Sequence, residues 1–357
     1  QGVLELWNAI NFVGMGRRTM AANLWRTVDI QTVWKRLPLI SALDDMANRP
    51  TYRTFIEHEA FDEYWKSYSL KGKYPQIQIP AYIVTGWYDN LLHEGFKLFR
   101  GWKQQAGNAQ ARALSRILVG PWTHYYLGGG VEYGAEISFN PHDVIDMPAE
   151  HLRWFDQRLR GIDTGIDREP PLKLYVMGAN IWRQAYEWPL PQTRYIHLYL
   201  HSGGRANSLH GDGRLDPGLP KDERADGFAY DPADPVPSWG GQIQPPTISG
   251  PRDRRSIERR DDVLVYTSDP LPADVEVTGP VELMLYAASS APDTDFTATL
   301  VDLHPNGKAI ILCEGIVRAR FRDSVERPML IEPGHVYLYR ISLWETSNLF
   351  LAGHRIR

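Results

Sequence analysis

The chain carries two short segments, Thr85-Gly86-Trp87-Tyr88-Asp89 and Val119-Gly120-Pro121-Trp122-Thr123-His124, each of which ends a buried apolar run with a turn and a polar side chain. The first run, from Ile79 to Thr85, is continuously apolar, which is typical of a parallel strand buried on both faces. Arg116 to Val119 predicts the next strand. Two such strands with a helix between them indicate an α/β protein with a parallel sheet.

The helix between these strands is predicted from an apolar stripe with members at i, i+4, i+7 and i+11, namely Leu92, Phe96, Phe99 and Lys103. The polar stretch from Gln104 to Asn108 then ends the helix. The stretch from Asp89 to His124 therefore suits one αβ step, because a βαβ unit takes about 30 residues or more. Both residues would lie just beyond the carboxyl ends of neighbouring strands, where open α/β sheets place their active sites.

Asp89 and His124 are the side-chain types that acyl transfer by a serine requires. The serine hydroxyl needs a base within hydrogen-bond reach, and that imidazole needs a buried carboxylate to fix its tautomer. In α/β hydrolases the order along the chain is Ser, then Asp or Glu, then His. Two plainer interpretations stay open at this point. Asp89 also occupies a helix N-cap position, and a loop histidine such as His124 is more often only hydrogen-bonded.

The N-terminal part of the chain is predicted to be helical. Residues 1–70 are rich in Trp, Leu, Ala and Met and have few strand-like runs. Their aromatic side chains, among them Trp7 and Phe12, could line an apolar pocket, although core packing is the commoner use of such residues. A second strong helical repeat runs from His151 to Leu159 and stops at Gly161.

The C-terminal part is predicted to be all-β. Leu172 to Gly178 is expected to be the last strand of the α/β layer. Beyond Pro191 the chain alternates short strands with turns rich in Gly, Pro, Asp and Asn, as in Ile196–Leu200, Val263–Tyr266 and Val281–Tyr286. This pattern is typical of a β-sandwich or jelly roll. The predicted domains are therefore residues 1–70, 71–187 and 188–357.

Composition excludes several classes of protein. The chain has 357 residues, 43% of them hydrophobic and 23% charged, and a net charge of −4, which is ordinary for a soluble globular protein without a nucleic-acid partner. Apolar runs fall short of the ~20 residues that span a bilayer, so no membrane partner is expected. The single cysteine, Cys313, lies in an apolar run and predicts a buried strand residue. The compartment stays open, with the cytoplasm favoured.

Further short motifs share the order and spacing of one known family. They are Gly86–Asp89, Gly120–His124, Arg158–Gly161, Val176–Gly178 with Trp182–Arg183, Tyr230–Pro237, Asp293–Thr297 and Ser347–Ile356. Over nearly the whole chain, this set resembles the cocaine esterase and X-prolyl dipeptidyl peptidase family of serine hydrolases. The resemblance implies an α/β hydrolase with a partial, parallel sheet and a helical cap, followed by a C-terminal all-β jelly roll of the galactose-binding-like sandwich type. It also implies that Asp89 is the triad acid and His124 the general base.

The chain departs from this family in its serine. None of the serines in the 357 residues lies in a Gly-x-Ser-x-Gly turn. The nucleophile is therefore expected upstream of Gln1, together with the early strands and the oxyanion donors. We expect this chain to be inactive by itself, because loss of a triad member lowers the rate by many orders of magnitude.

The resemblance predicts a small-molecule ester or amide as the substrate, and it allows a homodimer. Amino-ester hydrolases of the family carry carboxylates where this chain has Leu91 and Leu92, which favours a hydrophobic or aromatic ester. The predicted pocket residues are Trp87, Trp122, Tyr125, Trp7 and Phe12. An X-prolyl dipeptidyl peptidase or an acylase is an alternative, and a non-catalytic binding module that uses the jelly roll is an alternative of another class.

No cofactor or metal is predicted, because the serine mechanism needs neither. The pair Asp293 and Asp295 could suggest a cation site. Carboxylates in a turn between strands are more often turn formers and hydrogen-bond acceptors, and we favour that interpretation here.

Overall fold

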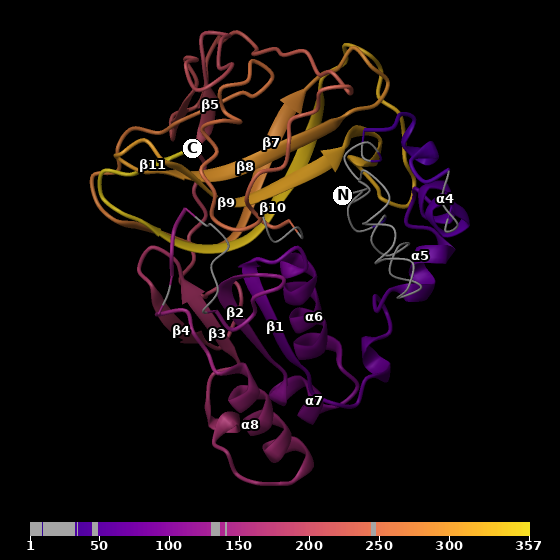
Figure 1. Cartoon of the computed structure of the whole chain (residues 1–357), viewed down its shortest axis with the longest axis vertical. Coiled ribbons are helices and arrows are strands. Elements are labelled where there is room, and N and C mark those ends of the chain that lie inside the picture. Colours follow the sequence, from indigo (N-terminus) through magenta and orange to yellow (C-terminus); the bar gives the residue numbers. More distant parts are fainter. Residues whose placement is uncertain are drawn as a thin grey trace. The chain divides into compact units, whose positions relative to one another are not determined.

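The computed structural model (Figure 1) describes Ala9, Val33 and residues 35–44, 49–129, 136–139, 141–243 and 248–357. The chain divides into two compact units. The first comprises Gln1–Lys71, Leu283–Thr297 and Ile316–Ile341, and the second comprises Gly72–Glu282, Ala298–Gly315 and Ser342–Arg357. The units cut across the all-β part, so the three domains expected from the sequence stay a prediction. Among the described residues, no helix combines the length and apolar character needed to cross a bilayer.

A four-stranded sheet in the second unit carries the two segments quoted first. Its strands lie in the order β1 (Tyr82–Tyr88), β2 (Arg116–Thr123), β3 (Leu172–Val176) and β4 (Ile181–Ala185). The pairs β1–β2 and β2–β3 are parallel, which confirms the predicted parallel sheet for three strands. The pair β3–β4 is antiparallel.

The prediction that Leu172 to Gly178 forms the last strand of this layer is wrong, because β4 continues the sheet. The chain reverses directly after β3 through Gly178 and Asn180, whose φ angles are 77° and 54°. Left-handed residues of this kind make the tight turns that join antiparallel neighbours.

Helix α6 (Leu92–Gln105) follows β1 and confirms the predicted apolar stripe. Leu92, Phe96 and Phe99 are all buried. A short helix that the sequence did not predict, α7 (Ala109–Leu114), comes next, and its Ala111 N–H donates to Asn108 Oδ1 at 2.7 Å. The sequence predicts Asn108 only as the polar end of α6, whereas its side chain caps a second helix.

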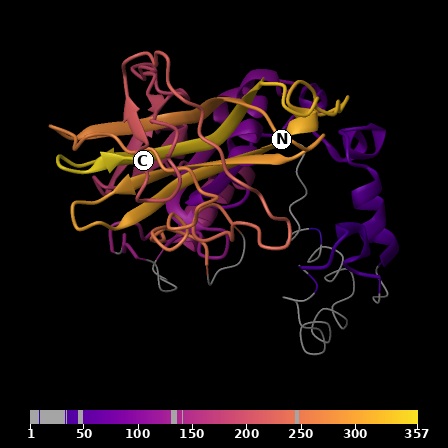
Figure 2. The ribbon, with the colours of Figure 1, turned by 90° about the horizontal axis from the view of Figure 1, so that it is seen from above.

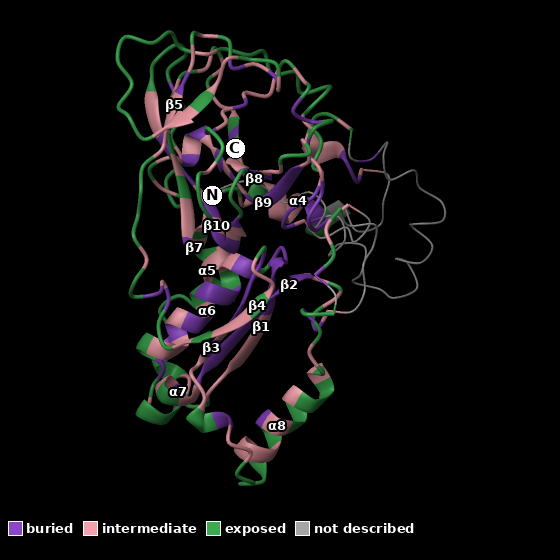
Figure 3. Ribbon diagram, turned by 90° about the vertical axis from the view of Figure 1, so that its left-hand side faces the viewer, coloured by how far each residue is buried: buried purple, intermediate pink, exposed green. Residues whose placement is uncertain are grey.

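Helix α8 (Met147–Leu159) confirms the second helical repeat and begins at an N-cap, Asp146, whose Oδ1 accepts from Ala149 N–H at 3.0 Å. The core of the second unit contains buried residues of β1, β2, β3 and α6, and it extends to Trp188, Leu312 and Phe350. Figure 3 shows β2 coloured as buried over most of its length, while exposed residues are frequent on α7 and α8.

The C-terminal strands form separate small sheets, which can be followed in orange and yellow in Figure 2. β7 (Val275–Ala287) pairs with β10 (Tyr337–Phe350), and β11 (Arg355–Ile356), β8 (Asp295–Leu303) and β9 (Ala309–Arg318) lie in that order. β5 (Tyr199–His201) pairs with β6 (Arg214–Asp216). Four short 3₁₀ turns complete the described elements: Leu39–Ser41, Tyr74–Gln76, Ile166–Arg168 and Ala319–Phe321.

Two details of the all-β part test the sequence predictions. Cys313 is fully buried in β9, as expected. The strand predicted at Val263–Tyr266 is wrong, since Leu264 makes only an isolated bridge with Asn207. Asn207 is a polar loop residue that forms this single bridge, whereas a β-ladder requires a continuous partner strand.

The first unit contains helices α4 (Arg49–Glu57) and α5 (Glu63–Tyr68). It also holds the two carboxylates considered as a cation site. Asp295 accepts two hydrogen bonds from the Arg318 guanidinium, both at 2.9 Å. Asp293 accepts from the backbone and the guanidinium of Arg320, at 2.9 and 2.7 Å. Both are hydrogen-bond acceptors, as the favoured interpretation predicted.

Candidate active site

Asp89 follows the last residue of β1 and is buried, with a side chain 3% exposed. The backbone N–H of Leu91 donates to its Oδ1 at 2.9 Å, and the Thr85 hydroxyl donates to its Oδ2 at 3.2 Å. The N-cap of α6 is Leu91, with no side-chain hydrogen bond, so Asp89 supports the turn before the helix without capping it. Together these contacts hold the buried carboxylate in one orientation.

His124 follows β2 and meets this carboxylate. Its Nδ1 lies 2.9 Å from Asp89 Oδ1, and its side chain is 30% exposed. An ionised carboxylate only accepts hydrogen bonds, so Nδ1 carries the proton and Nε2 keeps its lone pair. Among the described residues, no side chain forms a hydrogen bond with Nε2. The imidazole is therefore held with Nδ1 against the carboxylate and with Nε2 on the opposite side of the ring.

Two glycines allow the strand ends to come together. A Cβ at Gly86 would lie 2.1 Å from the carbonyl oxygen of Trp122, and a Cβ at Gly120 would lie 2.3 Å from the Trp122 ring. Gly86 pairs with Gly120, whereas Tyr88 pairs with Thr123, so β2 has one residue more than β1 between these pairs. This bulge brings the residue after β1 level with the residue after β2.

Thr85 is the neighbour of Asp89 that sequence reasoning missed. It precedes Asp89 by four positions, and the sequence pattern indicates only that it ends an apolar run. A hydroxyl residue in an otherwise apolar strand end is the signal that could have identified it. Tyr88, which adjoins Asp89, has another partner: its buried hydroxyl donates to Ile311 O at 3.2 Å, and burial raises its pKa above the ordinary value of a tyrosine.

The five aromatic residues predicted to line a pocket occupy different settings. Trp87 is fully buried, and its indole N–H donates to Tyr175 O at 2.6 Å. Trp122 is 3% exposed, and its indole N–H donates to Asp143 O at 3.2 Å. Both rings thus belong to the core of the second unit.

Tyr125 differs from both tryptophans because it is 50% exposed. Its ring lies edge-on to the His124 ring with centroids 5.4 Å apart. Of the five predicted residues, it is the one that the structure describes as both exposed and beside the base. Trp7 and Phe12 lie outside the described residues.

Two family models match the sequence. Residues 164–357 match the X-Pro dipeptidyl-peptidase C-terminal non-catalytic domain, and residues 5–126 match the X-Pro dipeptidyl-peptidase (S15 family) model. The second match contains Asp89 and His124. The first covers more than half of the chain.

Curated relatives agree with these matches. A cocaine esterase of Rhodococcus sp. is 42% identical over 305 residues, which are 84% of this chain and 51% of that protein. A protein of Mycobacterium bovis described as a serine esterase is 28% identical over 319 residues, 82% of this chain and 46% of that protein. The chain therefore spans about half the length of the curated relatives it matches.

Solved structures share the fold. An aminopeptidase from a marine-sediment Thaumarchaeota archaeon aligns with a TM-score of 0.70 and 24% identity over 89% of this chain and 53% of that one. An α-amino acid ester hydrolase aligns with a TM-score of 0.68 and 22% identity over 86% of this chain and 52% of that one. The two family matches, together with the 42% identity to the cocaine esterase, show that the chain belongs to the cocaine esterase and X-Pro dipeptidyl-peptidase family of α/β-hydrolase serine hydrolases.

Proposed function

We propose that the protein is a serine hydrolase that cleaves carboxylic esters, with Asp89 as the acid and His124 as the base of its triad. The observation that carries the proposal is the 2.9 Å contact between His124 Nδ1 and Asp89 Oδ1 beyond two neighbouring parallel strands. The buried carboxylate fixes the tautomer and so leaves the lone pair of Nε2 to accept the serine proton.

In the proposed reaction Nε2 of His124 takes up and releases a proton twice, once in acylation and once in deacylation. Nε2 first takes the hydroxyl proton of the nucleophilic serine as its oxygen attacks the ester carbonyl, and the negative charge of Asp89 stabilises the resulting imidazolium. The imidazolium then gives that proton to the leaving alkoxide, and an acyl-enzyme remains. A water molecule, deprotonated by the same nitrogen, then attacks the acyl-enzyme, and the imidazolium returns the proton to the serine oxygen as the carboxylic acid product leaves.

We propose that the serine lies in a part of the protein outside these residues. The 357 residues contain no Gly-x-Ser-x-Gly turn, and the curated relatives are about twice as long as the matched region. On this proposal the chain by itself binds but does not turn over an ester.

A hydrophobic or aromatic ester is the proposed substrate class. Leu91 is 48% exposed and Leu92 is fully buried. Because both are leucines, neither offers a carboxylate to a substrate ammonium group. Amide cleavage is the second candidate, and it is favoured by the match of residues 5–126 to the dipeptidyl-peptidase model. A binding module that uses the all-β part remains the alternative of another class.

The deciding experiment begins with the reading frame upstream of Gln1. The proposal requires a Gly-x-Ser-x-Gly codon run there, and a frame with another residue at that position favours the binding module. The complete protein is then assayed with p-nitrophenyl benzoate and with glycyl-prolyl p-nitroanilide, which separate ester from amide cleavage.

The variant His124→Ala tests the base in the same assays. The complete protein is expected to be labelled by a fluorophosphonate probe and to lose turnover in His124→Ala, while the 357-residue chain shows neither labelling nor turnover. Turnover by the 357-residue chain that depends on His124 would contradict the proposed position of the nucleophile. Full activity of His124→Ala in the complete protein would contradict the triad itself.

A further inference from the structure

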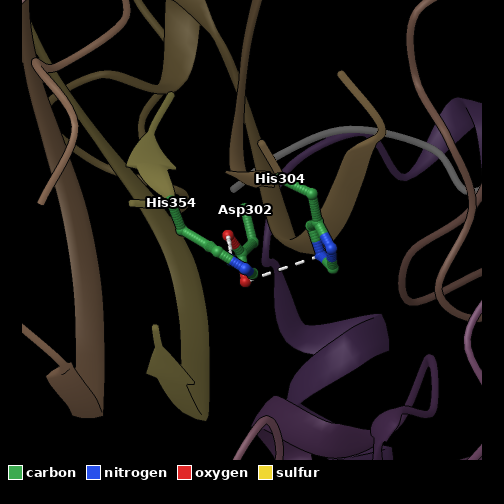
Figure 4. Close-up of side chains that lie close together, drawn as sticks. All are labelled: Asp302, His304 and His354. Atoms are coloured by element: carbon green, nitrogen blue, oxygen red, sulfur yellow. Dashed lines mark hydrogen bonds and ion pairs between the residues drawn. The ribbon is translucent and has the colours of Figure 1, made fainter. Parts of the chain in front are cut away.

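Three potential metal ligands lie together in the all-β part of the second unit, away from the segments that carry Asp89 and His124 in the sequence. They are Asp302, near the end of β8, His304, in the turn to β9, and His354, just before β11 (Figure 4). One ligand atom of each residue lies within 4.8 Å of the ligand atoms of the others. The strand pairing explains their proximity, because β11 lies antiparallel to β8, with Arg355 beside Leu303.

We propose that Asp302, His304 and His354 bind a divalent cation of the Zn²⁺ class, with an open coordination position for water or an external ligand. Such borderline cations bind imidazole nitrogen together with carboxylate oxygen. Ca²⁺ and Mg²⁺ prefer oxygen ligands alone. Three protein ligands leave one position of a tetrahedral ion free.

The spacing of the donors fits one ion. His354 Nδ1 lies 2.8 Å from Asp302 Oδ1, and His304 Nε2 lies 3.8 Å from Asp302 Oδ2. With metal–ligand bonds of about 2.0–2.1 Å, a tetrahedral ion holds its ligand atoms about 3.3 Å apart. The two distances end on different oxygens of the Asp302 carboxylate, so side-chain rotations that bring one of these oxygens between the two imidazole nitrogens would close the site.

His304 distinguishes this cluster from an ordinary hydrogen-bonded Asp–His pair. Its Nε2 atom is shielded from solvent and accepts or donates no hydrogen bond among the described residues. The ring packs on that of His354 with centroids 4.3 Å apart, and Nε2 faces the Asp302 carboxylate without reaching it (Figure 4). A bound cation would satisfy this nitrogen, whose burial is otherwise unfavourable.

The backbone holds the ligands in place before any ion binds. His304 N–H donates to Lys308 O at 2.8 Å, and His304 O accepts from Gly307 N–H at 2.8 Å. His354 N–H donates to Leu351 O at 3.0 Å, and His354 O accepts from Leu271 N–H at 2.8 Å. Ligands on such fixed backbone lose little freedom on binding.

The Asp302 carboxylate has an outer hydrogen-bond donor, and the position of the proton on the His354 ring is also compatible with a bound ion. Asn348 Nδ2 lies 3.5 Å from Asp302 Oδ2 and supports the carboxylate from β10. When the ion takes the lone pair of His354 Nδ1, the proton of that atom moves to Nε2 of the same ring, so the ligand stays neutral. Outer contacts of this kind orient metal ligands in many sites.

The test measures the binding of Zn²⁺ to the chelator-treated, full 357-residue chain by calorimetry. Co²⁺ serves as a spectroscopic probe of tetrahedral geometry. We expect one saturable site, visible Co²⁺ absorption, and an increase in the melting temperature, because an ion that binds only the native state stabilises it. Mg²⁺ at the same concentration is expected to give none of these signals.

The variant His304→Gln is expected to weaken Zn²⁺ binding by at least about tenfold, the size of loss that even outer-contact changes cause in metal sites. The matched control is His201→Gln. His201 also pairs with a carboxylate, at 2.7 Å from Glu223 Oε1, but its second nitrogen lies 3.0 Å from Gly218 O and is therefore occupied. This control is expected to bind Zn²⁺ like the parent.

Two results would overturn the proposal: no stoichiometric binding of Zn²⁺ by the parent chain, or equal binding by His304→Gln and the parent. X-ray absorption of the Zn²⁺-loaded parent decides the ligand set without any variant. Two imidazole nitrogens with oxygen support the site, and any ligand set without imidazole contradicts it.

Discussion

The Nδ1 atom of His124 lies 2.9 Å from Oδ1 of Asp89, and the two residues follow neighbouring parallel strands. Neither residue needs the other to hold it at its position beside the sheet. Each is positioned by its own strand, so the contact exists before substrate or nucleophile is present. On the proposed function, this prearranged pair lowers the reorganisation that the reaction needs.

Replacing the acid should therefore reduce catalysis without unfolding the protein. In Asp89→Asn the amide nitrogen or oxygen faces His124 Nδ1, and the imidazole loses the preference that keeps Nε2 free for the serine proton. We expect kcat of the complete enzyme for p-nitrophenyl benzoate to fall by about 10⁴-fold, the scale of the equivalent change in a serine protease. The matched control is Glu223→Gln, which removes a carboxylate from His201 and should leave kcat unchanged. Retention of more than about a tenth of the activity by Asp89→Asn would exclude the proposed role.

Substitution of Gly86, the β1 residue after which the register shifts, should lower the stability of the protein. A methyl group at Gly86 would lie 2.1 Å from a backbone oxygen, which cannot rotate away. We expect Gly86→Ala to lower the free energy of unfolding in urea by about 1–3 kcal/mol, the usual penalty for overpacking. Gly227→Ala is the control, because a Cβ there meets no atom within 4 Å, and it should change stability by less than about 0.5 kcal/mol. Equal stability of the two variants would show that the strand ends can separate freely.

Trp87 and Tyr125 should respond in opposite ways to substitution. Trp87→Phe leaves Tyr175 O without its indole donor inside the core, and we expect a loss of about 1–3 kcal/mol of stability. Tyr125→Ala removes a half-exposed ring beside His124, so stability should change by less than about 0.5 kcal/mol while KM of the complete enzyme rises. Thermal unfolding and steady-state kinetics on both variants check this. A rise in KM only for Trp87→Phe would contradict the assignment of Trp87 to the core.

The pair of His201 and Glu223 should make stability depend on pH. The hydrogen bond that His201 donates to the Glu223 carboxylate raises the pKa of His201 and lowers the pKa of Glu223. Stability from the raised histidine pKa is fully present below its unfolded value of about 6.5 and is lost as the pH rises through the folded value. Stability from the lowered carboxyl pKa is present above its unfolded value of about 4.3 and is lost as the pH falls. The pair should therefore stabilise most between about pH 4.3 and 6.5.

The variant His201→Gln measures this contribution. The melting temperature of the parent, relative to that of the variant, should be highest in the window given above and should decline on both sides of it. A difference in melting temperature that is constant from acid to alkaline pH would show that the pair is uncoupled from folding.

The elements around the candidate site could be predicted where the sequence carries local periodicity. The spacing of Leu92, Phe96 and Phe99 places one face of α6 on the sheet, and all three are buried. The buried runs before Asp89 and His124 identify two strands and hence the edge at which the pair meets. Local patterns succeed here because burial imposes a period on each element separately.

Features that depend on pairing between distant segments could not be predicted. β4 forms because the turn after β3 returns the chain to the sheet, whereas Val263–Tyr266 has β-forming residues but lacks a continuous partner strand. His304 and His354 come together only through the pairing of β11 with β8. A strand sequence shows which residues can pair, but it does not name the strand with which they pair.

The extra residue that β2 contributes between Gly120 and Thr123 has a consequence for how the family can vary. The alignment of Asp89 with His124 is set by a residue count, and no single side chain encodes it. Substitutions that preserve the bulge should leave this alignment intact. A regular ladder with the same number of residues would instead place Thr123 opposite Asp89 and His124 one residue beyond it, projecting from the other face. The bulge is therefore the feature of this stretch that variants of the family are expected to keep.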